Sequence, residues 1–296
     1  MWRLTLTCSL VALTAYVSEA QLKKFYSLPD DGTFDAINFT LNATSGSCYI
    51  RSEAGKVPLN IYGNPDFEKI NPNFHNWVDD RTNHVDLTLE DYNSSGFSKS
   101  ISYNVFGPEK KGKNFWKIYL SNEKEYSLNL NYGIGMANVD LAGIPLKNLN
   151  IKTGSADVEV DYSTEMSNQI EMDTFYVKVD LGSLDVQKME LCRANTVITD
   201  IGFGNASLEF SKVPQTKSTI EAMVGAGSLV VRVPKEDAPI IIYMNDSPLC
   251  SIKLPKGFEE VDDNVYVNLD YSPKAENLLT FNVDVALGNV TFKYTN

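Results

Sequence analysis

Two histidines and a group of carboxylates are the first candidates for chemistry in this sequence. His75 and His84 stand in the stretch NFHNWVDDRTNHVD, together with Asp79, Asp80 and Asp86. Imidazole and carboxylate groups bind metals and transfer protons near neutral pH. The separation of the two histidines does not match HExxH or a related helical pair that would aim both rings at one ion. We therefore interpret both as solvent-exposed loop residues and predict no metal site.

Neighbouring acids could form the carboxylate pair of a glycoside hydrolase or a calcium site. Glu159 and Asp161 alternate with apolar residues, so they share the outward face of one predicted strand. Glycoside hydrolysis needs two carboxylates that flank the substrate, and a carbohydrate-active β-solenoid enzyme stays open as an alternative. Clustered oxygens that could hold calcium occur at Asp30-Asp31-Gly32 and Asp262-Asp263-Asn264. Neither turn follows the EF-hand pattern, and we interpret these acids as solvating residues.

Motifs for nucleophilic or nucleotide chemistry are missing from the sequence. There is no GxSxG and no P-loop, and the two GxG triplets at Gly133-Ile134-Gly135 and Gly202-Phe203-Gly204 do not precede a helical pattern. A phosphate-binding glycine loop needs the N-terminus of a helix behind it. The sequence therefore predicts a protein that is not an enzyme and that needs no cofactor.

Aromatic side chains are better candidates for binding. Phe74, Trp77, Trp116 and Tyr119 gather in the irregular part of the chain before residue 126. Aromatic rings stack on sugars and anchor protein partners. We name these four as a candidate contact with a protein or glycan of the cell envelope; the alternative is that they pack beneath a loop.

The elements that position these residues follow a repeat that is clearest from Tyr126 to Pro234. Apolar and polar residues alternate up to a glycine corner and alternate again after it, as in YGIGMANVDL, KTGSADVEVDY, DLGSLDV, GFGNASLEF and VGAGSLVVRV. A period of two predicts half-buried strands, and a corner with tight backbone approach or a positive φ favours glycine. Recurrence at intervals near twenty residues predicts a stack of similar units.

The two ends of the chain depart from this repeat. Residues 21–125 form a predicted N-terminal β-rich region, in which SGSCYI resembles a degenerate first copy and residues 55–84 are predicted to be a loop-rich insertion. Residues 126–296 form the predicted repeat domain, and its last copy, FNVDVALGNVTFKY, is predicted to cap the stack. The fold class is therefore all-β, an elongated β-solenoid of strand-Gly-strand units.

The first twenty residues predict export. Arg3 precedes an uncharged apolar run from Leu4 to Val17, and Ser18-Glu19-Ala20 offers a small-x-small cleavage site. This order is typical of a secretory signal peptide, and the run is too short to cross a bilayer. An uncleaved anchor is the alternative. We predict a periplasmic, cell-surface or extracellular protein with no membrane span in the mature chain.

Charge and cysteine content limit the partners and the covalent links. The net charge of -12 argues against nucleic acid, which requires clustered lysine and arginine. The mature chain would hold Cys48, Cys192 and Cys250. An odd number permits at most one internal disulfide, and buried thiols are the favoured interpretation.

The run LNLNYGIGMANVDLAGIPLKNLNIKTGSADVEVDY, with VPKEDAPIIIY and LLTFNVDVALGNVTFKY behind it, resembles the toast-rack β-solenoid domain. This domain occurs in LiaF-type envelope-stress proteins and in adhesin-like bacterial proteins, and the resemblance covers about residues 126–296. It implies a β-solenoid fold and a place in the cell envelope, and it brings no catalytic residues. We expect an exported, non-enzymatic interaction or structural protein of adhesin-like type; a periplasmic regulator that binds an envelope-stress sensor is an alternative.

Overall fold

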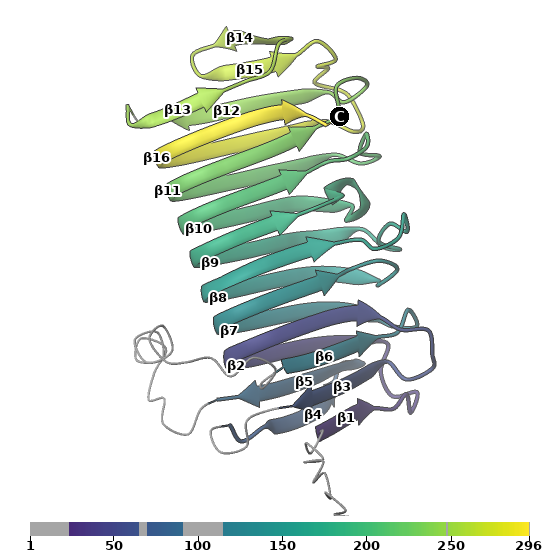
Figure 1. The fold of residues 1–296 in the computed structure, drawn as a ribbon. Coiled ribbons are helices and arrows are strands. Elements are labelled where there is room, and N and C mark those ends of the chain that lie inside the picture. The colour runs from purple at the N-terminus through teal and green to yellow at the C-terminus, as the bar shows by residue number, and fades with distance from the viewer. Residues whose placement is uncertain (1–23, 65–69, 91–114, 247, 296) are drawn as a thin grey trace, which may run out of the picture.

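The protein is described here by a computed structural model, which places residues 24–64, 70–90, 115–246 and 248–295. Sixteen strands and a short 3-10 turn at Met189–Leu191 account for the regular structure of these ranges. The strands stack along one axis with the C-terminus near one end (Figure 1). The predicted all-β solenoid is confirmed.

Seven long strands form the central part of the stack. They pair in parallel and in register, in the order β2-β7-β8-β9-β10-β11-β16. Their bounds are β2 Ala36–Ser52, β7 Glu125–Asp140, β8 Leu146–Asp161, β9 Met172–Val186, β10 Ala194–Glu209, β11 Ser218–Val233 and β16 Leu279–Tyr294. Each long strand is one rung of the stack.

Every rung bends in its middle, so that the stack has two layers with the core between them. In β10, Val197 and Ile201 are buried before the bend, and Ala206 and Leu208 are buried after it. The buried positions change from odd to even numbers across the bend, which a straight strand with strict alternation would not allow. We call the N-terminal halves of the rungs the first layer and the C-terminal halves the second layer. In Figure 1 the bends line one edge and the connecting loops line the other.

A column of glycines makes the bend possible. Residues at one position of successive rungs pair in register and have φ between 133° and 150°: Gly46, Gly135, Gly182, Gly204, Gly227 and Gly288. A Cβ on Gly204 would lie 1.9 Å from the carbonyl oxygen of Gly182. The sequence placed the corner of β8 at Gly154, but the register puts Ala156 opposite Gly135 and Gly182.

The N-terminal end completes the stack with shorter strands. β5 (Thr82–Leu89) pairs in parallel with the first half of β2, and β6 (Phe115–Leu120) pairs with its second half. Antiparallel strands lie beyond them: β4 (Asn73–Asp79) on β5, and β3 (Leu59–Asn64) then β1 (Lys24–Leu28) on β6. The predicted loop-rich insertion at 55–84 is thus wrong for β3, β4 and the start of β5.

The C-terminal end repeats this arrangement. β12 (Ile240–Asp246) and β13 (Cys250–Lys253) pair with the two halves of β16, and β15 (Val265–Asn268) and β14 (Phe258–Asp262) follow in antiparallel order. The last repeat was predicted to be the cap, whereas β16 lies between β11 and β12. The sheet is continuous across residue 126, and the predicted domain boundary there stays a prediction.

Buried polar groups hold the loop edge together. Asn168 is buried, accepts a hydrogen bond from the Leu146 amide at 2.9 Å and donates to the Leu146 carbonyl at 2.6 Å. Asn268 accepts a hydrogen bond from the Ile240 amide at 2.8 Å and donates one to the Ala238 carbonyl at 2.7 Å. No disulfide forms among the described residues, and Cys48 and Cys192 are buried.

Candidate functional site

The four aromatic candidates do not form one site. Phe74 and Trp77 lie on β4 in the first layer, while Trp116 and Tyr119 lie on β6 in the second. Phe74 is half-buried and stacks on Tyr26 with ring centroids 4.7 Å apart, so it contributes to the N-terminal core. Trp77 faces the opposite side of β4 because it lies three residues further along a strand.

Trp116 is not a surface residue, and its prediction as a partner contact is wrong. Its side chain is 2% exposed. A Cβ on Gly63, the residue opposite Trp116 on β3, would lie 2.2 Å from the indole ring. The missing side chain of Gly63 therefore makes the space that the indole fills.

Trp77 belongs to an exposed stack of three rings. His75 and His84 lie 5.5 Å and 5.0 Å from it between ring centroids, and Trp77 is 43% exposed. The two histidines were predicted to lie in a loop, but they lie on the paired strands β4 and β5. Asp80 and Arg81 form the turn between these strands with positive φ values, as a tight hairpin turn requires. The described residues contain no group of three or more metal-ligating side chains.

A second exposed aromatic group lies on the outer face of the second layer. Tyr62 of β3 contacts Phe25 of β1 at 4.8 Å and Tyr119 of β6 at 5.7 Å between ring centroids. Phe25 and Tyr62 were missed because the alternation in β1 and β3 spans only five and six residues. Tyr119 is the member of this group that the sequence identified.

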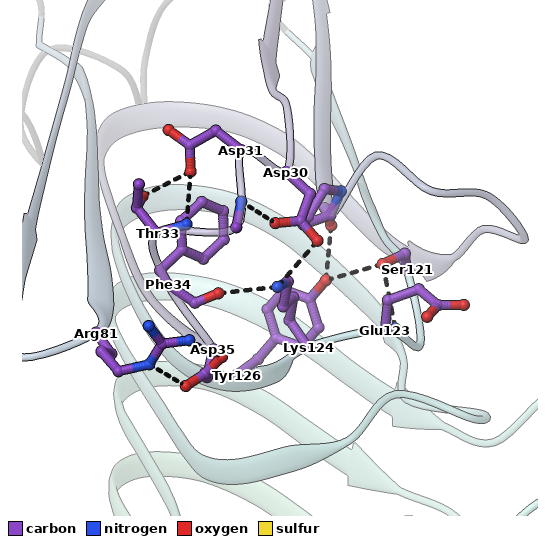
Figure 2. A network of polar contacts seen from close by, with 12 residues as sticks. Asp30, Asp31, Thr33, Phe34, Asp35, Arg81, Ser121, Glu123, Lys124 and Tyr126 are labelled. Carbon is purple, nitrogen blue, oxygen red and sulfur yellow. Dashed lines mark hydrogen bonds and ion pairs between the residues drawn. The ribbon is translucent and has the colours of Figure 1, made fainter.

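The acids at Asp30 and Asp31 hold a turn of the N-terminal end (Figure 2). Lys124 pairs with Asp30 at 2.9 Å and donates to the Phe34 carbonyl at 2.8 Å. The hydrogen bond from Lys124 lowers the pKa of Asp30, and the bond from the Thr33 hydroxyl lowers the pKa of Asp31. Both carboxylates are thus engaged by the chain itself.

The paired acids of β8 also have partners within the chain. Glu159 accepts a hydrogen bond from Asn138 at 3.0 Å, and Asp161 lies 3.8 Å from the Lys188 ammonium. Both lie on the outer face of the second layer, two residues apart on one strand. They do not face each other across a cleft, which is the arrangement that glycoside hydrolysis requires.

An array of amides covers part of the outer face of the first layer. We call it the amide face, and it consists of Asn38 and Asn42 of β2, Asn129 and Asn131 of β7, and Asn148 and Asn150 of β8. Asn129 donates to Asn38 and Asn131 donates to Asn42, each at 2.8 Å. Asn150 donates to Asn129 at 3.4 Å. Hydrogen bonds between neighbouring rungs therefore fix these side chains.

A shallow depression of about 330 Å³ adjoins the amide face on β8 and β9. Its walls include Asn129, Asn148, Asn150, Lys152, Thr174 and Tyr176. The Lys152 ammonium lies 5.7 Å from the centroid of the Tyr176 ring. Within the described chain, the buried Oδ1 atom of Asn150 has no hydrogen-bond partner. The sequence showed the asparagines, but their convergence depends on the register between rungs.

Apolar side chains are exposed along the bend edge. Leu181, Phe203 and Leu287 occupy the position before the glycine column, and each is at least half exposed. These positions are in register, and the small Ala226 of β11 lies between Phe203 and Leu287 in the same row.

Part of the sequence matches a known protein family. Residues 66–182 match the family described as "N-terminal domain of toast_rack, DUF2154". This match begins upstream of the segment in which the sequence suggested the resemblance and overlaps it from residue 126. The sequence has no match among curated proteins.

Some solved structures show distant similarity to this chain. A "putative cell adhesion protein" from Clostridium sporogenes is 17% identical, with a TM-score of 0.48 over 92% of this chain and 99% of that chain. A "putative adhesin" from Bacteroides fragilis is 15% identical, with a TM-score of 0.31 over 92% and 96%.

The described residues contain no helix that is both long and apolar enough to cross a membrane. The predicted signal peptide lies outside the described residues. The match of residues 66–182 to the toast-rack N-terminal domain family confirms the predicted resemblance.

Proposed function

We propose that the protein is an exported, non-enzymatic interaction protein of the cell envelope or cell surface, of adhesin-like type. The observation that carries the proposal is the pair of exposed aromatic groups at the N-terminal end. One group surrounds Trp77 on the first layer, and the other surrounds Tyr62 on the second. Exposed aromatic side chains that gather at one end of a molecule are typical of a contact surface.

Two further features support a binding role. The apolar row of Leu181, Phe203 and Leu287 exposes side chains that a partner could cover. The candidate acids bind lysine, asparagine or the turn backbone, and their arrangement supports recognition more than hydrolysis. Export is supported by the leader of residues 1–20, which has the charge and length of a signal peptide.

The location can be tested on intact native cells with an added protease. We expect the mature chain to be cut while a cytoplasmic marker survives. A chain that is protected, and released only with the periplasmic contents, would contradict an adhesive role. Such a result would favour the alternative, a periplasmic regulator. Crosslinking to inner-membrane proteins would then identify its partner.

The contact surface can be tested with two variants of β4. Trp77→Ala removes the centre of the exposed ring stack, and we expect it to reduce attachment of cells or of the purified protein to its native surface. Val78→Ala is the matched control, because Val78 has the same 43% exposure and lies on the other side of the strand. Equal attachment by both variants would exclude Trp77 from the contact.

A further inference from the structure

We infer that the amide face and the adjoining depression bind an uncharged glycan chain. This inference rests on the proposed function, since it names the partner class of an interaction protein. It concerns the part of the first layer that adjoins the Trp77 group, since Asn38 of the amide face pairs in register with His84.

The local charge favours an uncharged ligand. The protein has a net charge of -12. On β2, β7 and β8, the nine outward positions that pair across the amide face contain no acid and a single lysine: Asn38, Thr40, Asn42, Ser127, Asn129, Asn131, Asn148, Asn150 and Lys152. The neighbouring strand β5 places Asp86 beside Thr40, and the corresponding positions further along the same layer include Asp200, Glu221 and Asp284. The amide face is therefore a neutral polar region of an acidic protein.

The amides are arranged to bind hydroxyl groups. A carboxamide has two donor hydrogens and an oxygen with two lone pairs. Each hydrogen bond that an asparagine donates between rungs uses one of its donor hydrogens, as in Asn129 to Asn38, so the amide has a second donor hydrogen. Because the ladder fixes their orientation, little side-chain freedom would be lost when a ligand binds. Sugar hydroxyls both donate and accept, which suits such a surface.

The depression supplies an apolar plane beside these polar groups. Tyr176 contributes a ring that could pack against the C–H face of a pyranose. The buried Asn150 oxygen could accept a hydrogen bond from a sugar hydroxyl after a small movement of its side chain. The volume of about 330 Å³ is at the lower end of small-molecule sites, so it suits a single sugar unit.

The spacing of the rungs suits a chain more than a single sugar. Neighbouring strands lie about 4.8 Å apart, so β2 to β9 spans roughly 14 Å across three strand-to-strand steps. A linear glycan along the stack axis would place one unit against Tyr176. Its following units would meet amides on β8, β7 and β2 in turn.

Calorimetry on the purified full chain tests the site. The probes are the hexasaccharides of cellulose, xylan, mannan and laminarin, with hexagalacturonate and a heparin hexasaccharide as charged probes. We expect at least one uncharged hexasaccharide to bind, and more tightly than its disaccharide. Tyr176→Ala should weaken binding about tenfold, equivalent to about 1.4 kcal/mol. Tyr176→Phe should retain binding because it keeps the ring.

Tyr243→Ala is the matched control. Tyr243 occupies the same outward column as Tyr176, further along the first layer, and is exposed. Binding of charged probes alone, no binding of any uncharged probe, or an equal loss in Tyr176→Ala and Tyr243→Ala would overturn the inference. A protein ligand on this face, displaced by none of the sugars, would overturn it as well.

The two proposals can fail separately. Calorimetry does not depend on where the protein resides, so a surface protein that binds no sugar would refute only the glycan site. A protein that binds the sugar but resides inside the cell would refute only the proposed function.

Discussion

At the scale of single residues, the bend depends on a glycine in six of the seven rungs, and β8 has Ala156 at this position. Gly204→Ala would place a methyl group 1.9 Å from a backbone oxygen and would hold alanine at φ 150°. Because the opposing atom belongs to the backbone, it cannot rotate away. We expect the free energy of unfolding to fall by at least about 2 kcal/mol, as measured by urea denaturation.

Gly55→Ala is the control for this substitution. Gly55 is a described glycine in an exposed turn, and a Cβ there would meet no atom within 4 Å. Its effect should stay within about 0.5 kcal/mol. If the two variants lost equal stability, the steric explanation of the glycine column would be wrong.

Single residues also show how far the sequence could predict the candidate surfaces. Trp77 is exposed rather than packed beneath a loop, and its role as a partner contact stays a prediction. Trp116 was misplaced, because its burial depends on the absence of a side chain at Gly63 of another strand. Such a pairing is invisible until the register of β3 and β6 is known.

At the scale of elements, Lys124 links the turn before β2 to the turn before β7. The link includes Asp30, and the neighbouring pair of Arg81 and Asp35 joins the β4–β5 hairpin to the same region (Figure 2). Hydrogen bonds from Lys124 and Arg81 lower the pKa values of Asp30 and Asp35. The N-terminal strands are thus held by contacts that need ionised carboxylates.

This arrangement predicts a loss of stability in acid. A carboxyl whose pKa is lower in the folded state stabilises the fold above its unfolded value, here 3.8, and loses that effect as the pH falls through the folded value. Asp30→Asn should therefore lower the melting temperature at pH 7 and reduce its further fall between pH 5 and pH 2.5. Glu236 is an exposed acid in a turn, so Glu236→Gln should change neither the melting temperature at pH 7 nor its fall in acid. An unaltered pH dependence in Asp30→Asn would contradict the role of the Lys124 contact.

Alternation was sufficient to predict most individual strands but not their order. Leu128, Leu130 and Tyr132 are buried on one side of β7, as their period of two indicated. β4 was not predicted, because it is an outer strand that exposes most of its residues and therefore has little alternation of apolar and polar residues. The position of β16 between β11 and β12 was missed because strand partners are chosen across long sequence separations, which a local pattern does not record.

At the scale of the whole molecule, each rung is stabilised mainly by its two neighbours. A chain that ends at Leu278 would lack β16, and it would therefore expose the edge of β11 and remove the partner of β12 and β13. Open strand edges promote association. We expect this truncated protein to form oligomers in size-exclusion chromatography and to be cut by protease throughout residues 234–278. A protected, monomeric product would contradict the nearest-neighbour account.

The interior position of β16 also has a consequence for biosynthesis. Strands β12 to β15 are synthesised before β16, yet β12 and β13 reach their place in the sheet only through β16. During synthesis or export, the rungs up to β11 can assemble in the order in which they emerge. The strands within the following forty-five residues, 234–278, can join the sheet only after residues 279–294 have been synthesised and have paired with β11. Closure of this part of the stack therefore requires that translation has passed β16, and a chain terminated before β16 would leave the edge of β11 unpaired.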